Sequence, residues 1–120
     1  MKRQMMLMVT CIVMLGTLFM PVYRASAEEV TDSNLDRAIA AAKTSADHEA
    51  IASYYDKEAA DAEAKAKLHH AMHHRYEDFK LKPADMAHHC DELAKYFERV
   101  ADQDKSLAKE HREMAKKAEK

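Results

Sequence analysis

The sequence predicts an all-α protein in which two long antiparallel helices form a hairpin behind a short N-terminal helix. Beyond residue 27 the chain contains no glycine and a single proline, Pro83, so very little in it interrupts a helix. Alanine, glutamate, lysine and aspartate are abundant in this part, a composition typical of long helices. Apolar residues recur there at steps of three and four, which is the spacing of a packed helical stripe.

Residues 1–27 have the three parts of a secretory signal peptide. Lys2 and Arg3 give a charged start, and an apolar run follows from Met5 to Met20. Ala25-Ser26-Ala27 is a small-residue cleavage site. The run is shorter than the ~20 residues that a membrane-spanning helix needs. We therefore expect a periplasmic or secreted protein that has no membrane span after cleavage near Ala27.

The chain that remains after cleavage is acidic, with 16 Lys and Arg against 21 Asp and Glu, a formal charge of −5. No basic patch stands out in it, so we do not expect a nucleic-acid partner. It lacks glycine loops, a serine nucleophile in a suitable setting and a C-x-x-C-H haem motif, so we do not expect an enzyme. Its lone cysteine, Cys90, is a free thiol, a metal ligand or half of an intermolecular disulfide.

Residues 28–43 predict a short helix and a linker. The segment Thr31 to Ser33 offers side chains that can cap the start of this helix. One side of the helix is apolar and consists of Leu35, Ala38, Ile39 and Ala42.

Residues 44–120 predict the hairpin itself. Thr44 with Asp47 three residues later has the pattern of a capping box, which marks a helix start. Nothing breaks this helix before about Phe79. The segment 80–83 is the expected turn, and its Pro83 suits the first position of a second helix that runs to about Ala118.

The two long helices repeat each other at an offset of 42 residues. Two copies of one helix joined by a short turn are expected to pack antiparallel about an approximate two-fold axis. The matching pairs include Tyr54/Tyr96, Tyr55/Phe97, Ala52/Ala94, Ala59/Ala101, Ala66/Ala108, His69/His111 and Met72/Met114.

The periodicity predicts which residues lie in the seam between the helices. Antiparallel pairing in which residue numbers sum to 159 places Ala62 opposite Phe97. Tyr54, Tyr96 and Leu107 flank this seam on one side and need cover, either from the short helix or from a second hairpin in a four-helix bundle. The predicted seam residues are His48, Ile51, Tyr55, Ala59, Ala62, Ala66, His69, His73 and Tyr76 on the first helix, and Met86, Cys90, Leu93, Phe97, Val100, Asp104, Ala108 and His111 on the second.

The same register brings four soft or borderline metal ligands together near the turn. His69 lies opposite Cys90 and His73 lies opposite Met86, two ligands from each helix. Thiolate, thioether and imidazole together favour copper over Mg²⁺ or Ca²⁺, which prefer oxygen ligands. The sequence therefore predicts a copper site at these four residues. Flanking alternative ligands are Met72 and His89.

The opposite end of the seam predicts a weaker second site made of His48, His111 and Met114. The repeat relates His48 to Cys90 and His111 to His69. Three further histidines point away from the seam and are expected at the surface, where they can capture metal loosely: His70, His74 and His88.

The pairs His69/Met72, Met86/His89 and His111/Met114, behind a signal peptide, resemble those of small periplasmic silver- and copper-binding resistance proteins. That resemblance implies sequestration of Cu(I) or Ag(I), with each pair acting as ligands. The chain also looks like the small exported helical-hairpin proteins of proteobacteria, through the H-C-x-x-L-A segment from His89 and the H-x-x-M-A segment from His111. This group has no settled function, so the second resemblance implies the fold alone.

Two functional hypotheses follow from the sequence. The first is an exported helical protein that binds copper for buffering or tolerance. The alternative is a metal-free structural or interaction module of the cell envelope, with a homodimer or partner helices covering the flank of the seam. A dimer linked by a disulfide through Cys90 is a third reading.

Overall fold

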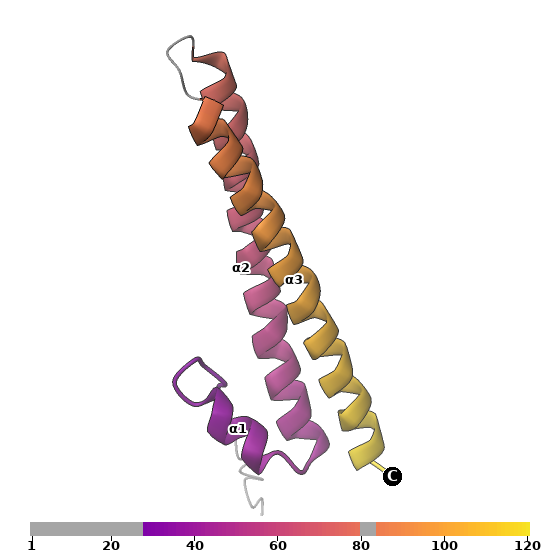
Figure 1. Cartoon of the computed structure of the whole chain (residues 1–120). Helices are drawn as coiled ribbons and strands as arrows, with labels where there is room; N and C mark the ends of the chain where they lie inside the picture. The colour runs from indigo at the N-terminus through magenta and orange to yellow at the C-terminus, as the bar shows by residue number, and fades with distance from the viewer. Residues whose placement is uncertain (1–27, 80–83) are drawn as a thin grey trace, which may run out of the picture.

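The computed structural model describes residues 28–79 and 84–120 and contains three helices. They are α1 (Leu35–Ala41), α2 (Ser45–Asp78) and α3 (Ala84–Ala118). Figure 1 shows α2 and α3 running side by side along their length, with α1 beside the end of α2 that lies far from the turn. The predicted helical hairpin is confirmed, whereas the expected signal peptide at residues 1–27 and the turn at 80–83 lie outside the described residues. None of the described helices is long and apolar enough to cross a membrane.

Helix α2 starts at the predicted capping box. The Thr44 hydroxyl accepts a hydrogen bond from the backbone N–H of Asp47 (3.2 Å), and the Asp47 carboxylate accepts one from the N–H of Thr44 (2.9 Å). The same carboxylate accepts a third hydrogen bond from the N–H of Lys43 (3.0 Å). These backbone donors lower the pKa of Asp47. The bonds to the N–H groups of Thr44 and Asp47 satisfy donors that the helix start leaves without a partner.

The N-terminal cap of α1 lies one residue beyond the segment Thr31 to Ser33 that was expected to provide it. Its N-cap is Asn34, and the Asn34 side chain does not cap the helix but accepts a hydrogen bond from the N–H of Thr31 (2.7 Å). The segment before it reaches α2, where the Tyr54 hydroxyl donates to Asp32 (2.9 Å). Burial, followed by this hydrogen bond to a carboxylate, raises the pKa of Tyr54 to about 12. The N-terminal segment therefore contacts Tyr54, whereas Tyr96 and Leu107, which were also expected to need cover, remain exposed.

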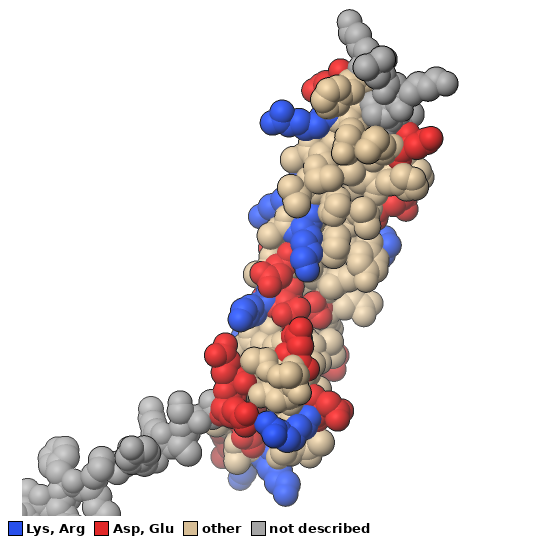
Figure 2. Space-filling model, turned by 90° about the vertical axis from the view of Figure 1, so that its left-hand side faces the viewer, with Lys and Arg blue, Asp and Glu red and all other residues tan. Residues whose placement is uncertain are grey.

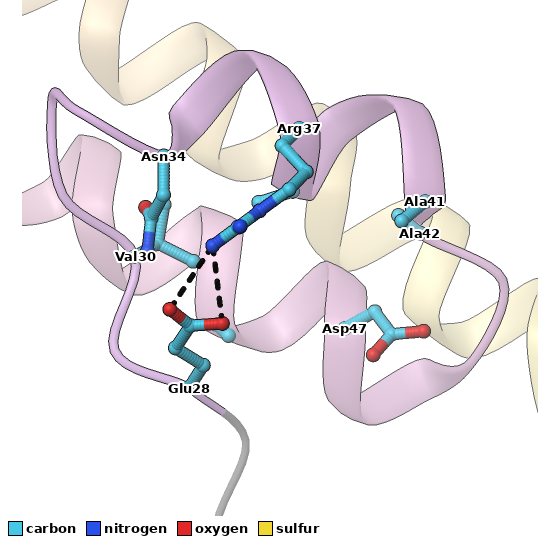
Figure 3. Close-up of a pocket in the computed structure, with 9 residues that line it drawn as sticks. Glu28, Val30, Asn34, Arg37, Ala41, Ala42 and Asp47 are labelled. Carbon is cyan, nitrogen blue, oxygen red and sulfur yellow. Dashed lines mark hydrogen bonds and ion pairs between the residues drawn. The ribbon is translucent and has the colours of Figure 1, made fainter.

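A pocket of about 220 Å³ lies between α1 and the start of α2. Figure 3 shows the ion pair of Arg37 and Glu28 (3.1 Å) beside it, with the Asp47 carboxylate at the far side. Its remaining lining is largely alanine, which offers a ligand little besides apolar surface.

The seam between α2 and α3 is built on alanine at every seventh position. On α3 the buried column is Ala87, Ala94, Ala101, Ala108 and Ala115, with Cys90 and His111 between its members. On α2 the buried alanines are Ala52, Ala59, Ala62 and Ala66. Small side chains at this spacing let the two backbones approach closely along the whole hairpin.

Helix α3 is rotated by about one residue from the predicted seam. Met86 is 51% exposed and Leu93 is 42% exposed, whereas their neighbours Ala87 and Ala94 are buried. The contact of Phe97 differs as well, because its ring lies against His69 and not opposite Ala62. A column of alanines packs more closely than one of Met and Leu, so the larger side chains move to the edge of the interface.

Contacts between the helices follow the 42-residue repeat. His69 stacks on Phe97 (centroids 5.6 Å apart, 9° between planes), and its repeat partner His111 stacks on Tyr55 (5.9 Å, 24°). His70 pairs with Glu98 (2.8 Å), and the repeat partners of these two residues are Arg112 and Asp56, which also pair. Glu63 pairs with Lys105, its own repeat partner. The two long helices are thus related by an approximate two-fold axis that passes near Glu63 and Lys105.

Candidate metal sites

Six of the eight histidines lie at the turn end of the hairpin, in the last part of α2 and the first part of α3. Figure 2 shows that, on the face turned to the viewer, this half carries few charged side chains, whereas acidic side chains gather in the other half. The histidines of this end are His69, His70, His73 and His74 on α2 and His88 and His89 on α3.

His69 lies in the seam, and one of its ring nitrogens forms no hydrogen bond. Its ring is held by the parallel stack on Phe97. Its Nδ1 atom is buried and has no hydrogen-bond partner, alone among the buried side-chain nitrogen and oxygen atoms of the described residues. A buried polar atom without a partner is costly and calls for an explanation, such as an ion bound there.

Cys90 is a free cysteine that is only 5% exposed. The repeat relates the pair Cys90 and His69 to the pair His48 and His111. In the second pair the two Nδ1 atoms lie 3.2 Å apart across the seam. The repeat therefore predicts that Cys90 lies relative to His69 as His48 lies relative to His111. An intermolecular disulfide through so buried a thiol would require the two helices to separate.

The structure divides the four predicted copper ligands into separate groups. His73 turns its Nδ1 to the backbone carbonyl of Ala87 on α3 (2.9 Å) and its Nε2 to Glu77 (3.4 Å). Met86 is half-exposed at the edge of the interface. His69, His73 and Cys90 do not form a group whose ligand atoms all lie within 4.8 Å of one another. His69 and Cys90 share the seam, while His73 takes part in a different cluster.

That cluster consists of His73, His74 and Glu77. It is the one set of three or more His, Cys, Asp or Glu side chains, in residues 28–79 and 84–120, whose ligand atoms lie within 4.8 Å of one another. Sequence reasoning overlooked Glu77 and treated His74 as a separate surface residue. The signal was present as spacing, because a carboxylate three and four residues after two adjacent histidines shares their helix face.

The remaining predicted ligands are placed less favourably. Met72 is half-buried and His89 is exposed, as is His88. The Nε2 atom of His70 is hydrogen-bonded to the Glu98 carboxylate (2.8 Å).

The predicted second site retains its two histidines but not its methionine as a buried ligand. His48 and His111 face each other as the register predicts, and one ring must donate to the other. His111 is 9% exposed, and burial, followed by the proximity of His48, lowers the pKa of His111. Met114 is 44% exposed.

No protein-family model, curated protein or solved structure matches this chain.

Proposed function

We propose that this chain is an exported protein that binds a soft metal ion, copper(I), in the seam between α2 and α3 and so buffers copper or confers tolerance to it. The ligands are Nδ1 of His69 and the thiolate of Cys90. The observation that carries the proposal is the buried Nδ1 of His69, which lacks a hydrogen-bond partner. Cys90 enters through the repeat, which relates the pair His69 and Cys90 to the facing pair His111 and His48.

The chemistry of this pair favours Cu(I). A thiolate is the softest ligand a protein offers, and imidazole also suits copper. Cu(I) accepts low coordination numbers, so two ligands from facing helices suffice to hold it. The surrounding alanines provide no oxygen ligand, which disfavours Mg²⁺ and Ca²⁺. Met72 and Met86 lie within a turn of the pair along their helices and can each add a thioether.

The repeat offers an internal comparison. The equivalent pair at the other end, His48 and His111, has imidazole in place of the thiolate. It is therefore expected to bind Cu(I) more weakly, and Met114 is the thioether available there. Duplication of a helix followed by a single His or Cys replacement gives one strong and one weak site.

A competition titration with a chromogenic Cu(I) chelator under anaerobic conditions tests this proposal. We expect one tight equivalent in the purified protein and a loss of at least about tenfold in affinity in Cys90→Ala and in His69→Gln. His89→Gln serves as the control, because His89 is exposed on the helix that carries Cys90. Tight binding that survives Cys90→Ala would overturn the assignment of this pair.

A second candidate function is a metal-independent interaction module, and one observation favours it. Every seventh residue on α3, one position before the alanine column, is apolar and at least partly exposed: Met86, Leu93, Val100, Leu107 and Met114. We call this the α3 apolar line. On α2 the 42-residue repeat relates Ile51 to Leu93 and Tyr54 to Tyr96. Ile51 is fully buried and Tyr54 is bonded to the N-terminal segment, whereas Leu93 and Tyr96 are exposed.

The partner for the α3 apolar line under this proposal is a second copy of the chain, which would form a four-helix bundle. Sedimentation measurements with and without chelator test it. Leu93→Glu together with Leu107→Glu should give monomers, and Leu68→Glu, at an exposed leucine on α2, should leave the assembly unchanged. A chain that is monomeric at high concentration with and without metal would rule this candidate out.

A further inference from the structure

The cluster of His73, His74 and Glu77 has the composition of a divalent-metal site. The Nε2 atom of His73 lies 3.4 Å from one carboxylate oxygen of Glu77, and the Nδ1 atom of His74 lies 3.4 Å from the other. Two imidazoles and one carboxylate, with no sulfur, suit borderline divalent ions such as Zn²⁺, Ni²⁺, Co²⁺ or Cu²⁺.

The hydrogen bond of His73 to α3 prepares its ring to act as a ligand. A backbone carbonyl can only accept, so Nδ1 of His73 must carry the proton in its 2.9 Å bond to the Ala87 oxygen. In the neutral ring, Nε2 then carries the free electron pair, and this is the atom that faces Glu77. Metal-binding histidines typically donate their second N–H to a carbonyl or carboxylate in this way, which fixes both tautomer and orientation.

Position on the helix supports the same reading. His73 and Glu77 are four residues apart and His74 and Glu77 are three apart, so all three side chains share one face of the last turns of α2. The C-terminal end of a helix carries a partial negative charge, which favours a cation there. His73 is half-buried whereas His74 and Glu77 are exposed, so an ion on this face is open to solvent and can complete its shell with water.

We propose that His73, His74 and Glu77 form a second metal site, for a divalent ion of the zinc class, separate from the Cu(I) site in the seam. The ligands are Nε2 of His73, Nδ1 of His74 and the carboxylate of Glu77. Because His73 is also bonded to the first turn of α3, an ion held here ties the end of α2 to the start of α3. The two proposed sites thus differ in chemistry, with the soft ion between the helices and the borderline ion at the C-terminal end of α2.

A zinc competition titration of the purified protein with a fluorescent indicator tests the proposal. Glu77→Gln keeps the shape of the side chain and removes its charge, and it should weaken Zn²⁺ binding at least about tenfold. His74→Gln should do the same. Asp78→Asn is the matched control, since it removes the same charge one residue further along and should change the affinity little. Zn²⁺ should also raise the melting temperature of the unmodified protein and of Asp78→Asn, but not that of Glu77→Gln.

Two results would overturn this assignment. Equal weakening by Glu77→Gln and Asp78→Asn would mean that zinc responds only to the general charge of the surface. Loss of zinc binding in Cys90→Ala, with Glu77→Gln unaffected, would place zinc in the seam. The Cu(I) proposal is tested separately, because its variants are Cys90→Ala and His69→Gln and its ion is different.

Discussion

The imidazole of His69 and the ring of Phe97 lie nearly parallel across the seam, 9° apart in plane and 5.6 Å between centroids. This stack fixes the plane of the His69 ring and with it the direction of the unpartnered Nδ1 atom. The hairpin contains the same arrangement a second time, between His111 and Tyr55, where Nδ1 meets a second histidine.

Replacing the aromatic ring of each stack should separate its effect on the orientation of His69 from its effect on the stability of the hairpin. Phe97→Leu and Tyr55→Leu should each destabilise the hairpin by about 0.5–1.5 kcal/mol, the contribution of an aromatic pair. Only Phe97→Leu should also weaken Cu(I) binding, because only that stack orients His69. Thermal denaturation and Cu(I) titration of both variants provide the measurement. If Tyr55→Leu weakens Cu(I) binding as much, the stack does not position the ligand.

The buried alanines of α2 should tolerate no larger side chain. Ala59 is buried in the seam, whereas the next residue, Ala60, is exposed. Ala59→Leu forces extra volume between closely packed helices and should cost about 1–3 kcal/mol of unfolding free energy. Ala60→Leu should change it little, and urea denaturation compares the two. Equal stability of these variants would mean that the helices do not approach closely at Ala59.

The capping box should contribute measurably to the stability of α2. Thr44→Ala removes the hydroxyl that accepts from the Asp47 N–H and should cost about 1 kcal/mol. Ser53→Ala is the control, because the Ser53 hydroxyl bonds back to the Glu49 carbonyl within the helix and caps nothing. Chemical denaturation should therefore give a lower midpoint for Thr44→Ala than for Ser53→Ala, and the reverse order would contradict this account.

The buried histidine pair should make the protein less stable in weak acid. Burial, followed by the proximity of His48, holds the pKa of His111 below its ordinary value of about 6.5, while Glu110 acts weakly in the opposite direction. The unfolded chain therefore takes up this proton first. Stability should fall as pH drops through about 6.5 and stop falling below the pKa of the folded state.

Melting temperatures measured from pH 8 to pH 5 test that dependence. The decline should be shallower in His111→Gln than in the unmodified protein, whatever the absolute stability of the variant. His89→Gln, at an exposed position, should keep the full decline. A parallel decline in the unmodified protein and in His111→Gln would show that another group controls the acid response.

The fold was largely predictable because its signals are local. A chain with no glycine after residue 27 and the Thr44/Asp47 pair specify where α2 begins, and the structure has both the cap and the helix. The 42-residue repeat predicted antiparallel packing. The rotation of α3 was not anticipated, because hydrophobicity favours Met86 and Leu93 as seam residues, whereas close packing favours Ala87 and Ala94.

The candidate sites were less predictable, because ligand geometry depends on register and on single hydrogen bonds. The Phe97 ring lies against His69, seven residues beyond its predicted partner Ala62, and His73 bonds to the Ala87 carbonyl of α3. The facing of His48 and His111 followed from the predicted register. Glu77 was not predicted because only sulfur and imidazole ligands were considered, although its spacing from His73 and His74 is present in the sequence.

The most direct test of the central claim is X-ray absorption at the copper edge of protein loaded with one equivalent of Cu(I). We expect a low-coordinate ion with sulfur and imidazole nitrogen as neighbours, and a spectrum that changes when Cys90 is replaced by alanine. A first shell of nitrogen and oxygen only, or a spectrum that Cys90→Ala leaves unchanged, would contradict the proposal that the seam holds copper through His69 and Cys90.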